Sequence, residues 1–181
     1  MAPTRIMFIR HAEKPGQPPN GGDGVTVDGK QDDESLTVRG WQRAGALAKF
    51  FSSQPPMRPN TIFAAGVGHG SKSERPKQTV TPLAQLLNIF ETDTFVTTHL
   101  KNDRQQLIDD VMSRKGVVLV AWQHELIPGL VGLLPNAPDV PQKWPDGRFD
   151  VVWVFDPAGT GWAFSQVPQL LLAGDVKTPI S

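Results

Sequence analysis

Short apolar runs follow one another along this chain, separated by longer stretches in which apolar residues recur at helical spacing. The short runs are rich in Val, Ile, Phe and Trp, which favour strands, and they lie at residues 5–9, 61–65, 117–122, 150–155 and 162–167. The helical spacing predicts helices at residues 37–52, 75–89 and 102–113, with a further helix-like stretch at 125–134. Strands that alternate with helices favour crossover units. We therefore predict an α/β fold, a three-layer α/β/α sandwich around a mainly parallel sheet.

The last two predicted strands are separated by the turn-rich residues 156–161, which predict a hairpin and therefore an antiparallel strand at the edge of the sheet. Residues 15–29 and 135–147 are rich in proline and glycine, lack helical periodicity and are expected to be loops. The first loop contains Asp28-Gly29, a favoured hairpin turn. It is either a flap beside a functional site or a disordered excursion. No repeat or second core is visible, so we expect residues 1–181 to form a single domain.

Composition narrows the classes of protein that this chain could be. The 18 basic and 18 acidic residues balance, so nothing global attracts nucleic acid or an anionic membrane, and attraction for an anion must be local. The absence of cysteine excludes disulfides, thiolate zinc sites and a cysteine nucleophile. The N-terminus lacks the pattern of a signal peptide, and no apolar run approaches the roughly 18 residues that span a bilayer. We expect a soluble cytoplasmic protein with no nucleic-acid or membrane partner.

An arginine and a histidine, Arg10 and His11, stand directly after the first predicted strand. Ligands of open α/β sheets bind beyond the carboxyl ends of the strands. A guanidinium beside an imidazole at that place suits an anionic substrate and a nitrogen nucleophile, and phosphate is the anion that fits best. The attacking ring nitrogen must be unprotonated, so the other one should donate to a fixed acceptor such as a backbone carbonyl.

Four segments of the chain, taken together, resemble the histidine phosphatase superfamily, which includes the phosphoglycerate mutases and the histidine acid phosphatases. They follow in the family's order and are Arg10-His11-Ala12-Glu13, residues 35–44 (SLTVRGWQRA), residues 71–79 (SKSERPKQT) and residues 117–124 (VVLVAWQH). The resemblance implies a small, single-domain member with a phosphoglycerate mutase-like fold.

The same resemblance assigns roles to four residues. It implies that His11 forms a covalent phosphohistidine and that Arg10, Arg75 and His124 bind the phosphoryl group. Guanidinium forks match phosphate oxygens bidentately and stay charged at any working pH. Arg75 stands where a helix is expected to begin, and a helix N-terminus also attracts phosphate. The resemblance implies neither a metal nor a cofactor.

The residue that protonates the leaving group is less well defined by the sequence. The acid phosphatase branch uses an aspartate directly after its second histidine, and Glu125 stands at that position, so we expect Glu125 to be the acid. Lys14 stands where that branch has its second arginine and is expected to contact the substrate. Glu13 is the competing carboxylate.

These features predict a phosphatase that hydrolyses a phosphomonoester or a phosphoprotein. A phosphohistidine or phosphoprotein phosphatase and a phosphoglycerate mutase-like phosphotransferase are alternatives within the enzyme class. A non-catalytic module that binds a phosphorylated ligand is the alternative outside it. The sequence does not determine the substrate or the oligomeric state.

Overall fold

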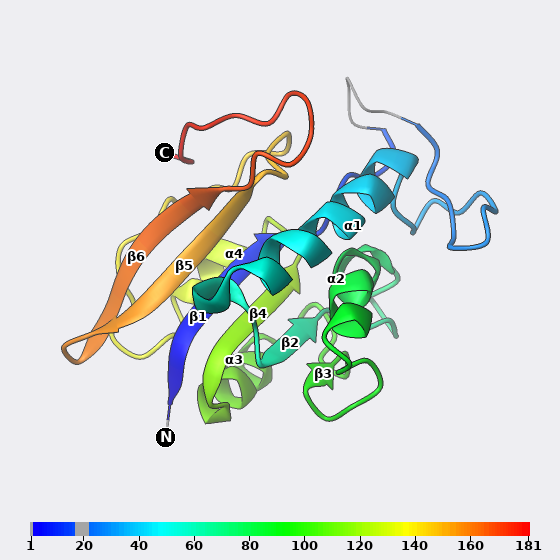
Figure 1. The fold of residues 1–181 in the computed structure, drawn as a ribbon. Coiled ribbons are helices and arrows are strands. Elements are labelled where there is room, and N and C mark those ends of the chain that lie inside the picture. The colour runs from blue at the N-terminus through cyan, green and yellow to red at the C-terminus, as the bar shows by residue number, and fades with distance from the viewer. Residues whose placement is uncertain (1, 17–21) are drawn as a thin grey trace.

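A six-stranded sheet forms the centre of the computed structural model, which describes residues 2–16 and 22–181 (Figure 1). The order of the strands along the sheet is β3-β2-β4-β1-β5-β6. The strands are β1 (Pro3–Arg10), β2 (Thr61–Ala64), β3 (Phe95–Val96), β4 (Gly116–Trp122), β5 (Val151–Ala158) and β6 (Gly161–Pro168). All the predicted strands are present. β3 was not predicted, because two residues are too few to produce a pattern.

The sheet is parallel except at one edge. β1, β4, β2 and β3 pair in parallel, whereas β5 runs antiparallel to β1 and pairs with β6 in an antiparallel hairpin. The mainly parallel sheet with an antiparallel edge strand is therefore confirmed. The hairpin is longer than predicted, because Ala158 pairs with Gly161 and only Gly159 and Thr160 form the turn. Gly159 adopts a φ of 58°, which suits glycine.

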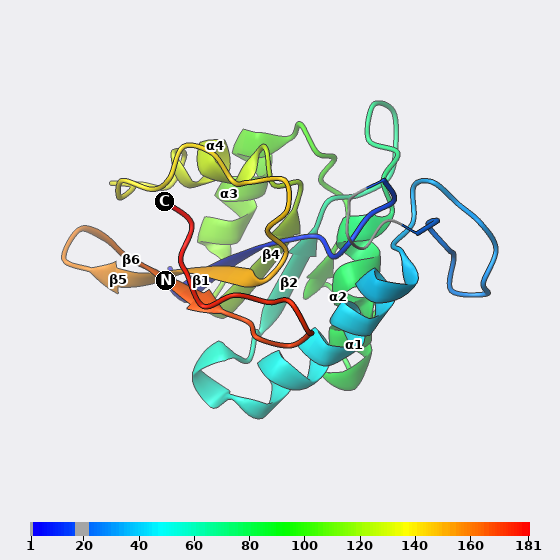
Figure 2. The same ribbon diagram turned by 90° about the horizontal axis from the view of Figure 1, so that it is seen from above.

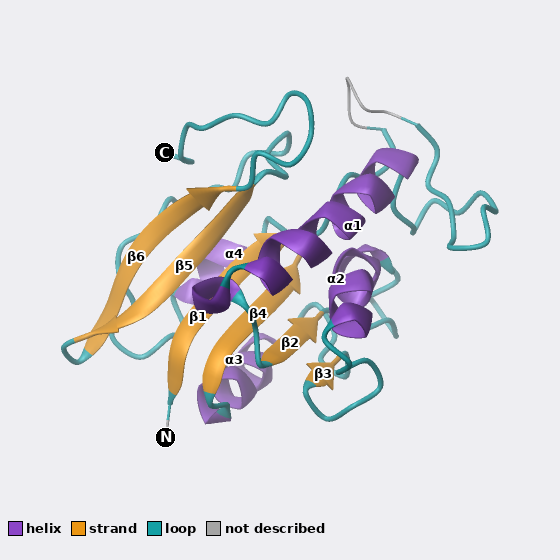
Figure 3. Ribbon diagram, in the orientation of Figure 1, coloured by secondary structure: helices purple, strands orange, loops and turns teal. Residues whose placement is uncertain are grey.

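Helices cover both faces of the sheet (Figures 2 and 3). Side chains of α1 and α2 pack with Met7 and Ile9 of β1, and those of α3 and α4 pack with Ile6 and Phe8. Successive residues of a strand point to opposite faces, so this alternation builds the predicted three-layer α/β/α sandwich. The helices are α1 (Val38–Ser53), α2 (Arg75–Leu86), α3 (Arg104–Ser113), α4 (Ile127–Val131) and the 3₁₀ turn η1 (Pro55–Met57).

Three helices are shorter than the spacing predicted, and α3 differs only in that it begins two residues later, at Arg104. α2 ends at Leu86, and Asn88 then adopts a φ of 57°, a left-handed conformation that a helix cannot continue through. α4 occupies only the middle of the predicted stretch. Within the described ranges, no helix is both long and apolar enough to cross a membrane.

The loop after β1 is fastened on two sides. The backbone nitrogen of His11 donates to the carbonyl oxygen of Trp122 at 3.1 Å, which ties the loop to the end of β4. On the other side, the backbone nitrogen of Thr37 donates to the carbonyl oxygen of Glu13 at 3.0 Å. The Thr37 side chain also caps α1 by accepting from the Gly40 nitrogen at 3.2 Å. The strand end and the helix start therefore hold His11 in place together.

Candidate active site

A cavity of about 330 Å³ lies beyond the carboxyl ends of β1 and β4. Ligands bind at this edge in open α/β sheets. Among the described residues, no group of three or more His, Cys, Asp or Glu side chains is placed to hold a metal ion. The cavity is lined by His11, Lys14, Glu34, Gly70, Lys72, Ser73, Arg75, Lys101, Gln123 and Glu125.

The His11 imidazole is held as a neutral ring. Its side chain is buried, and Nδ1 lies 2.8 Å from the carbonyl oxygen of Ala12, so the ring proton is assigned to Nδ1. Burial, and then the positive charge of Arg10, lowers the pKa of His11 from 6.5 to about 3. Within the described ranges no group bonds to Nε2, which carries the free lone pair. His11 thus combines an unprotonated nitrogen with a fixed ring, as a nucleophile requires.

Arg10 lies beneath the cavity and is not among the residues that line it. It is 1% exposed, Nη1 donates to the carbonyl oxygen of Asp146, and the guanidinium carbon lies 3.8 Å from the centre of the Phe149 ring. Burial lowers its pKa to about 10, so Arg10 still carries its charge at neutral pH. In the described part of the chain, Nε and Nη2 are buried without a hydrogen-bond partner. Two N–H groups of Arg10, the residue before His11, are thus left unpaired in the described part of the chain.

Arg75 and Lys14 add positive charge to the wall of the cavity. Arg75 is the first residue of α2, and its guanidinium donates to the carbonyl oxygens of Ser35, at 3.2 Å, and Asp33. These hydrogen bonds hold the Arg75 guanidinium against the segment that contains Asp33 and Ser35. The charges of Arg75 and Lys14 both lower the pKa of His11, which places them near the ring.

His124 lies between two carboxylates. Its Nε2 lies 2.8 Å from Oδ1 of Asp146, and its Nδ1 lies 2.9 Å from Oε2 of Glu125, an ion-pair distance without the alignment of a hydrogen bond. The contact with His124 is the main reason why the pKa of Glu125 falls to about 2. Glu125 is therefore ionised at neutral pH in this arrangement, and it has no proton to donate. Asp146, which the sequence analysis did not identify, is the hydrogen-bond partner of the Nε2 atom of His124.

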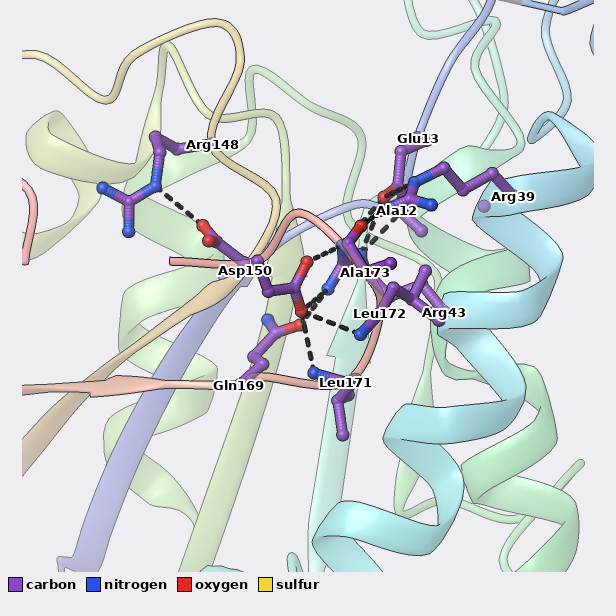
Figure 4. A network of polar contacts seen from close by, with 12 residues as sticks. Ala12, Glu13, Arg39, Arg43, Arg148, Asp150, Gln169, Leu171, Leu172 and Ala173 are labelled. Carbon is purple, nitrogen blue, oxygen red and sulfur yellow. Dashed lines mark hydrogen bonds and ion pairs between the residues drawn. The ribbon is translucent and has the colours of Figure 1, made fainter. Parts of the chain in front are cut away.

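Glu13 lies in a buried network of ion pairs (Figure 4). Both of its carboxylate oxygens accept from Arg43, at 2.8 to 3.0 Å, and Arg39 lies 3.3 Å away. Arg43 also binds Asp175 at 2.7 Å and Gln169 at 3.0 Å. Glu13 does not line the cavity, so the structure does not support it as the acid. Its contacts instead tie the loop of His11 to α1 and to the C-terminal segment.

The residues that follow the loop after β1 form one wall of the cavity. Residues 17–21 of the predicted flap lie outside the described residues. In the described part, Val25 pairs with Gln31 around Gly29, whose φ is 81°, so the predicted Asp28-Gly29 turn is present. The Nε1 of Trp41 donates to the carbonyl oxygen of Val25 at 2.8 Å and fastens this segment to α1. The segment reaches the cavity at Glu34.

The structure brings together most of the residues that the sequence predicted and adds others. His11, Lys14, Arg75 and Glu125 line the cavity, and Arg10 and His124 are buried directly behind it. The sequence analysis assigned no role to Lys72, Lys101 or Gln123, which also line the cavity. Lys72 stands in the 71–79 segment at a position that the motif leaves open, Lys101 belongs to no motif, and Gln123 could have been found only by its place between an apolar strand and His124.

No protein-family model and no curated protein sequence matches this chain. Three solved structures resemble it over nearly their whole length. A protein from Agrobacterium tumefaciens assigned as the phosphohistidine phosphatase SixA is 19% identical, with a TM-score of 0.51, over 91% of this chain and 97% of its own. An Escherichia coli K-12 protein assigned as an alpha-ribazole-5'-P phosphatase is 13% identical, with a TM-score of 0.53, over 91% and 96%. A phosphoserine phosphatase variant from Entamoeba histolytica, in complex with phosphoserine, is 15% identical, with a TM-score of 0.52, over 93% and 98%.

These likenesses establish the fold. The chain has the same α/β fold as these three proteins, and the phosphoglycerate mutase-like fold that the sequence analysis expected is confirmed.

Proposed function

We propose that this protein is a phosphatase that hydrolyses a phosphomonoester through a covalent phosphohistidine at His11. The observation that carries the proposal is a buried imidazole with a pKa of about 3 and a free Nε2, set in a cavity among positive charges. A neutral nitrogen that stays unprotonated throughout the physiological range suits nucleophilic attack on phosphorus. Fixed cations around it stabilise the charge on the equatorial oxygens of the transition state.

The reaction runs in two steps. The lone pair of His11 Nε2 forms a bond to phosphorus as the bond to the leaving oxygen breaks, and that oxygen departs with the electron pair. Water then attacks the phosphohistidine, the phosphorus–nitrogen bond breaks, and inorganic phosphate leaves a neutral His11. In both steps Arg75 and the free N–H groups of Arg10 bind the phosphoryl oxygens.

Glu125 is proposed to protonate the leaving group. Its pKa of about 2 results chiefly from His124, and a phosphate dianion in the cavity would act in the opposite direction. A like charge nearby disfavours the ionised form, so substrate binding raises the pKa of Glu125 and loads it with a proton. The acid is then formed only when substrate is present.

Replacement of the nucleophile tests the proposal. We expect His11→Ala to abolish turnover of p-nitrophenyl phosphate, because no other residue that lines the cavity carries an imidazole. His69→Ala is the matched control, since His69 is exposed and does not line the cavity. A folded His11→Ala variant with undiminished turnover would overturn the mechanism. Phosphate binding without turnover in the unaltered protein would favour the non-catalytic binding module.

The role of Glu125 is tested with two leaving groups. General acid catalysis contributes about 10²–10⁴-fold when the leaving group is poor. Glu125→Gln should therefore slow hydrolysis of an alkyl phosphate by that order and hydrolysis of p-nitrophenyl phosphate much less. Equal losses on both substrates would remove Glu125 from the role of acid.

A phosphohistidine or phosphoprotein phosphatase is the second candidate, and the ionised Glu125 favours it. An imidazole leaving group needs less help from an acid than an alkoxide, so a carboxylate with a pKa of about 2 is no obstacle. The likeness to the Agrobacterium tumefaciens protein is in keeping with this choice. This candidate is supported if the protein hydrolyses a phosphohistidine peptide faster than every phosphomonoester tested and if Glu125→Gln changes the rate on that peptide little. Transfer of the phosphoryl group to a second hydroxyl would indicate the phosphoglycerate mutase-like alternative.

A further inference from the structure

The cavity has more room than a phosphoryl group uses. Its volume of about 330 Å³ falls at the lower end of the ~300–1,000 Å³ typical of small-ligand sites. His11, Arg75 and Glu125 carry the proposed reaction. Lys72, Lys101 and Gln123 also line the cavity and have no role in that reaction.

Gln123 is a buried amide without partners. It is 6% exposed, and neither Nε2 nor Oε1 has a hydrogen-bond partner among the described residues. A buried polar group left unpaired costs about 1–3 kcal/mol, and unpaired groups of this kind gather at functional sites. The Gln123 backbone is fixed at the end of β4, where its carbonyl oxygen accepts from the Leu126 nitrogen at 3.0 Å. Its amide therefore offers the cavity one donor group and one acceptor.

The loops that carry Lys72 and Lys101 are joined to each other. The Ser71 hydroxyl, 1% exposed, donates to the carbonyl oxygen of Gly66 at 2.6 Å and accepts from the backbone nitrogen of Lys101 at 3.4 Å. The Nε1 of Trp122 donates to the carbonyl oxygen of Lys101 at 3.2 Å and ties the same loop to β4. Hydrogen bonds thus connect the backbone segments that carry Lys72, Lys101 and Gln123.

Neither lysine is neutralised by the protein. In residues 2–16 and 22–181, no carboxylate lies within 4.0 Å of the amino group of Lys72 or Lys101. The lining has four cations and two carboxylates, and the buried Arg10 precedes His11. With a phosphomonoester dianion bound and Glu125 protonated as proposed, two positive charges are left without a counter-charge.

We propose that Lys72, Lys101 and Gln123 form a second subsite, which binds an anionic group that the substrate carries beside its phosphoryl group. Lys72 and Lys101 pair with a carboxylate or a second phosphate, and Gln123 bonds to a polar group between the two anions. The inference rests on the proposed function, because it places the phosphoryl group at His11. The anion belongs either to a small phosphorylated acid or to an acidic residue of a phosphopeptide.

A matched pair of substrates tests the subsite. Phenyl phosphate and 4-carboxyphenyl phosphate differ by one carboxylate on similar leaving groups, so the ratio of their kcat/KM values isolates the second anion. Ion pairs with Lys72, which is exposed, and Lys101, which is half-buried, predict a preference of roughly tenfold, about 1.4 kcal/mol, for the carboxylated ester. The Lys72→Gln/Lys101→Gln variant should bring the ratio close to one. The control is Lys49→Gln/Lys115→Gln, which removes the same charge at exposed positions outside the lining and should keep the preference.

Binding separates failure of the subsite from failure of the proposed function. Calorimetry with phosphonoacetate and methylphosphonate, which cannot be hydrolysed, should show the same roughly tenfold preference for the compound with the carboxylate. If neither ester is turned over, the proposed function fails, and the calorimetric preference still decides the subsite. A ratio near one in the unaltered protein, or a preference that survives in Lys72→Gln/Lys101→Gln, overturns it.

The source of the anion is resolved by two further substrates. A phosphopeptide with glutamates beside its phosphorylated residue is compared with the same peptide carrying glutamines. If only the acidic peptide shows the lysine-dependent preference, the anion comes from a protein. If only the small carboxylated ester shows it, the substrate is a small phosphorylated acid.

Discussion

Arg43 is the residue whose replacement should destabilise the fold most through charge alone. It is 2% exposed and binds Glu13 and Asp175, two carboxylates that are themselves almost fully buried. Burial opposes its charge, yet the hydrogen bonds that Arg43 donates to Asp175 and Glu13 outweigh burial and raise the pKa of Arg43. Arg43→Met keeps an apolar stem, removes the guanidinium and leaves the two buried carboxylates without their main partner.

The size of the effect follows from that burial. Breaking a buried pair by removal of one partner costs about 3–5 kcal/mol, whereas an exposed pair is worth about 0–1 kcal/mol. For a chain of this length each kcal/mol lowers Tm by roughly 2–4 °C. We therefore expect Arg43→Met to lower Tm by roughly 6–20 °C.

Urea unfolding of a mutant cycle measures the coupling. The cycle consists of Arg43→Met, Asp175→Asn and the double variant, with Arg58→Met as an exposed control. The double variant should lose less than the two single losses added together, because Asp175→Asn removes a charge that Arg43→Met leaves unpaired. A loss below about 1 kcal/mol in Arg43→Met, comparable to an exposed pair, would refute this reasoning.

Three further predictions concern the loop of the candidate nucleophile and its surroundings. The pKa of His11 is lowered from 6.5 to about 3 in the folded protein. Between these two pH values His11 is protonated in the unfolded chain and neutral in the folded one, so the stability decreases as the pH is lowered through this range. Between pH 6.5 and pH 4.5 the free energy of unfolding, measured with urea, should fall by roughly 2–3 kcal/mol more in the unaltered protein than in His11→Asn. Equal losses in the two proteins would contradict the shifted pKa. Gly40→Ala places a Cβ 2.5 Å from the backbone of this loop and should lower both stability and turnover. Gly45→Ala meets nothing within 4 Å on the same helix and should stabilise by about 0.5–1 kcal/mol, so similar outcomes for the two variants would contradict the close approach. Asp146→Ala frees the ring of His124 and should tighten binding of inorganic phosphate in calorimetry, and weaker binding would show that Asp146 instead supports the site.

The strands and the core were predictable because the signal lies within each segment. β1 and β4 are continuous apolar runs buried on both faces, and such runs are recognisable without knowledge of the partners. The boundaries were less predictable. The left-handed Asn88 that follows α2 depends on local backbone geometry, which apolar spacing does not report.

The candidate site was predictable only where its residues stand in motifs at strand and helix ends. His11, Arg75 and His124 belong to such motifs. The segments that contain them follow β1, β2 and β4, which are adjacent in the sheet, so these residues come close together. Lys101 has no motif, and its loop is placed by long-range contacts with β4 and with Ser71.

The contacts of Glu13 could not be predicted for the same reason. Its partners Arg43 and Asp175 are 30 positions away and at the opposite end of the chain, so the sequence showed a carboxylate beside His11 but not the network that uses it.

The most direct test of the central claim is to find the phosphoryl group on the protein. The protein is mixed with p-nitrophenyl phosphate, quenched in alkali because phosphohistidine is labile in acid, digested and examined by mass spectrometry. The account predicts phosphate on His11, at Nε2 because Nδ1 is engaged by the Ala12 carbonyl. Turnover with no covalent phosphate on the chain, or with phosphate on a different residue, would contradict it.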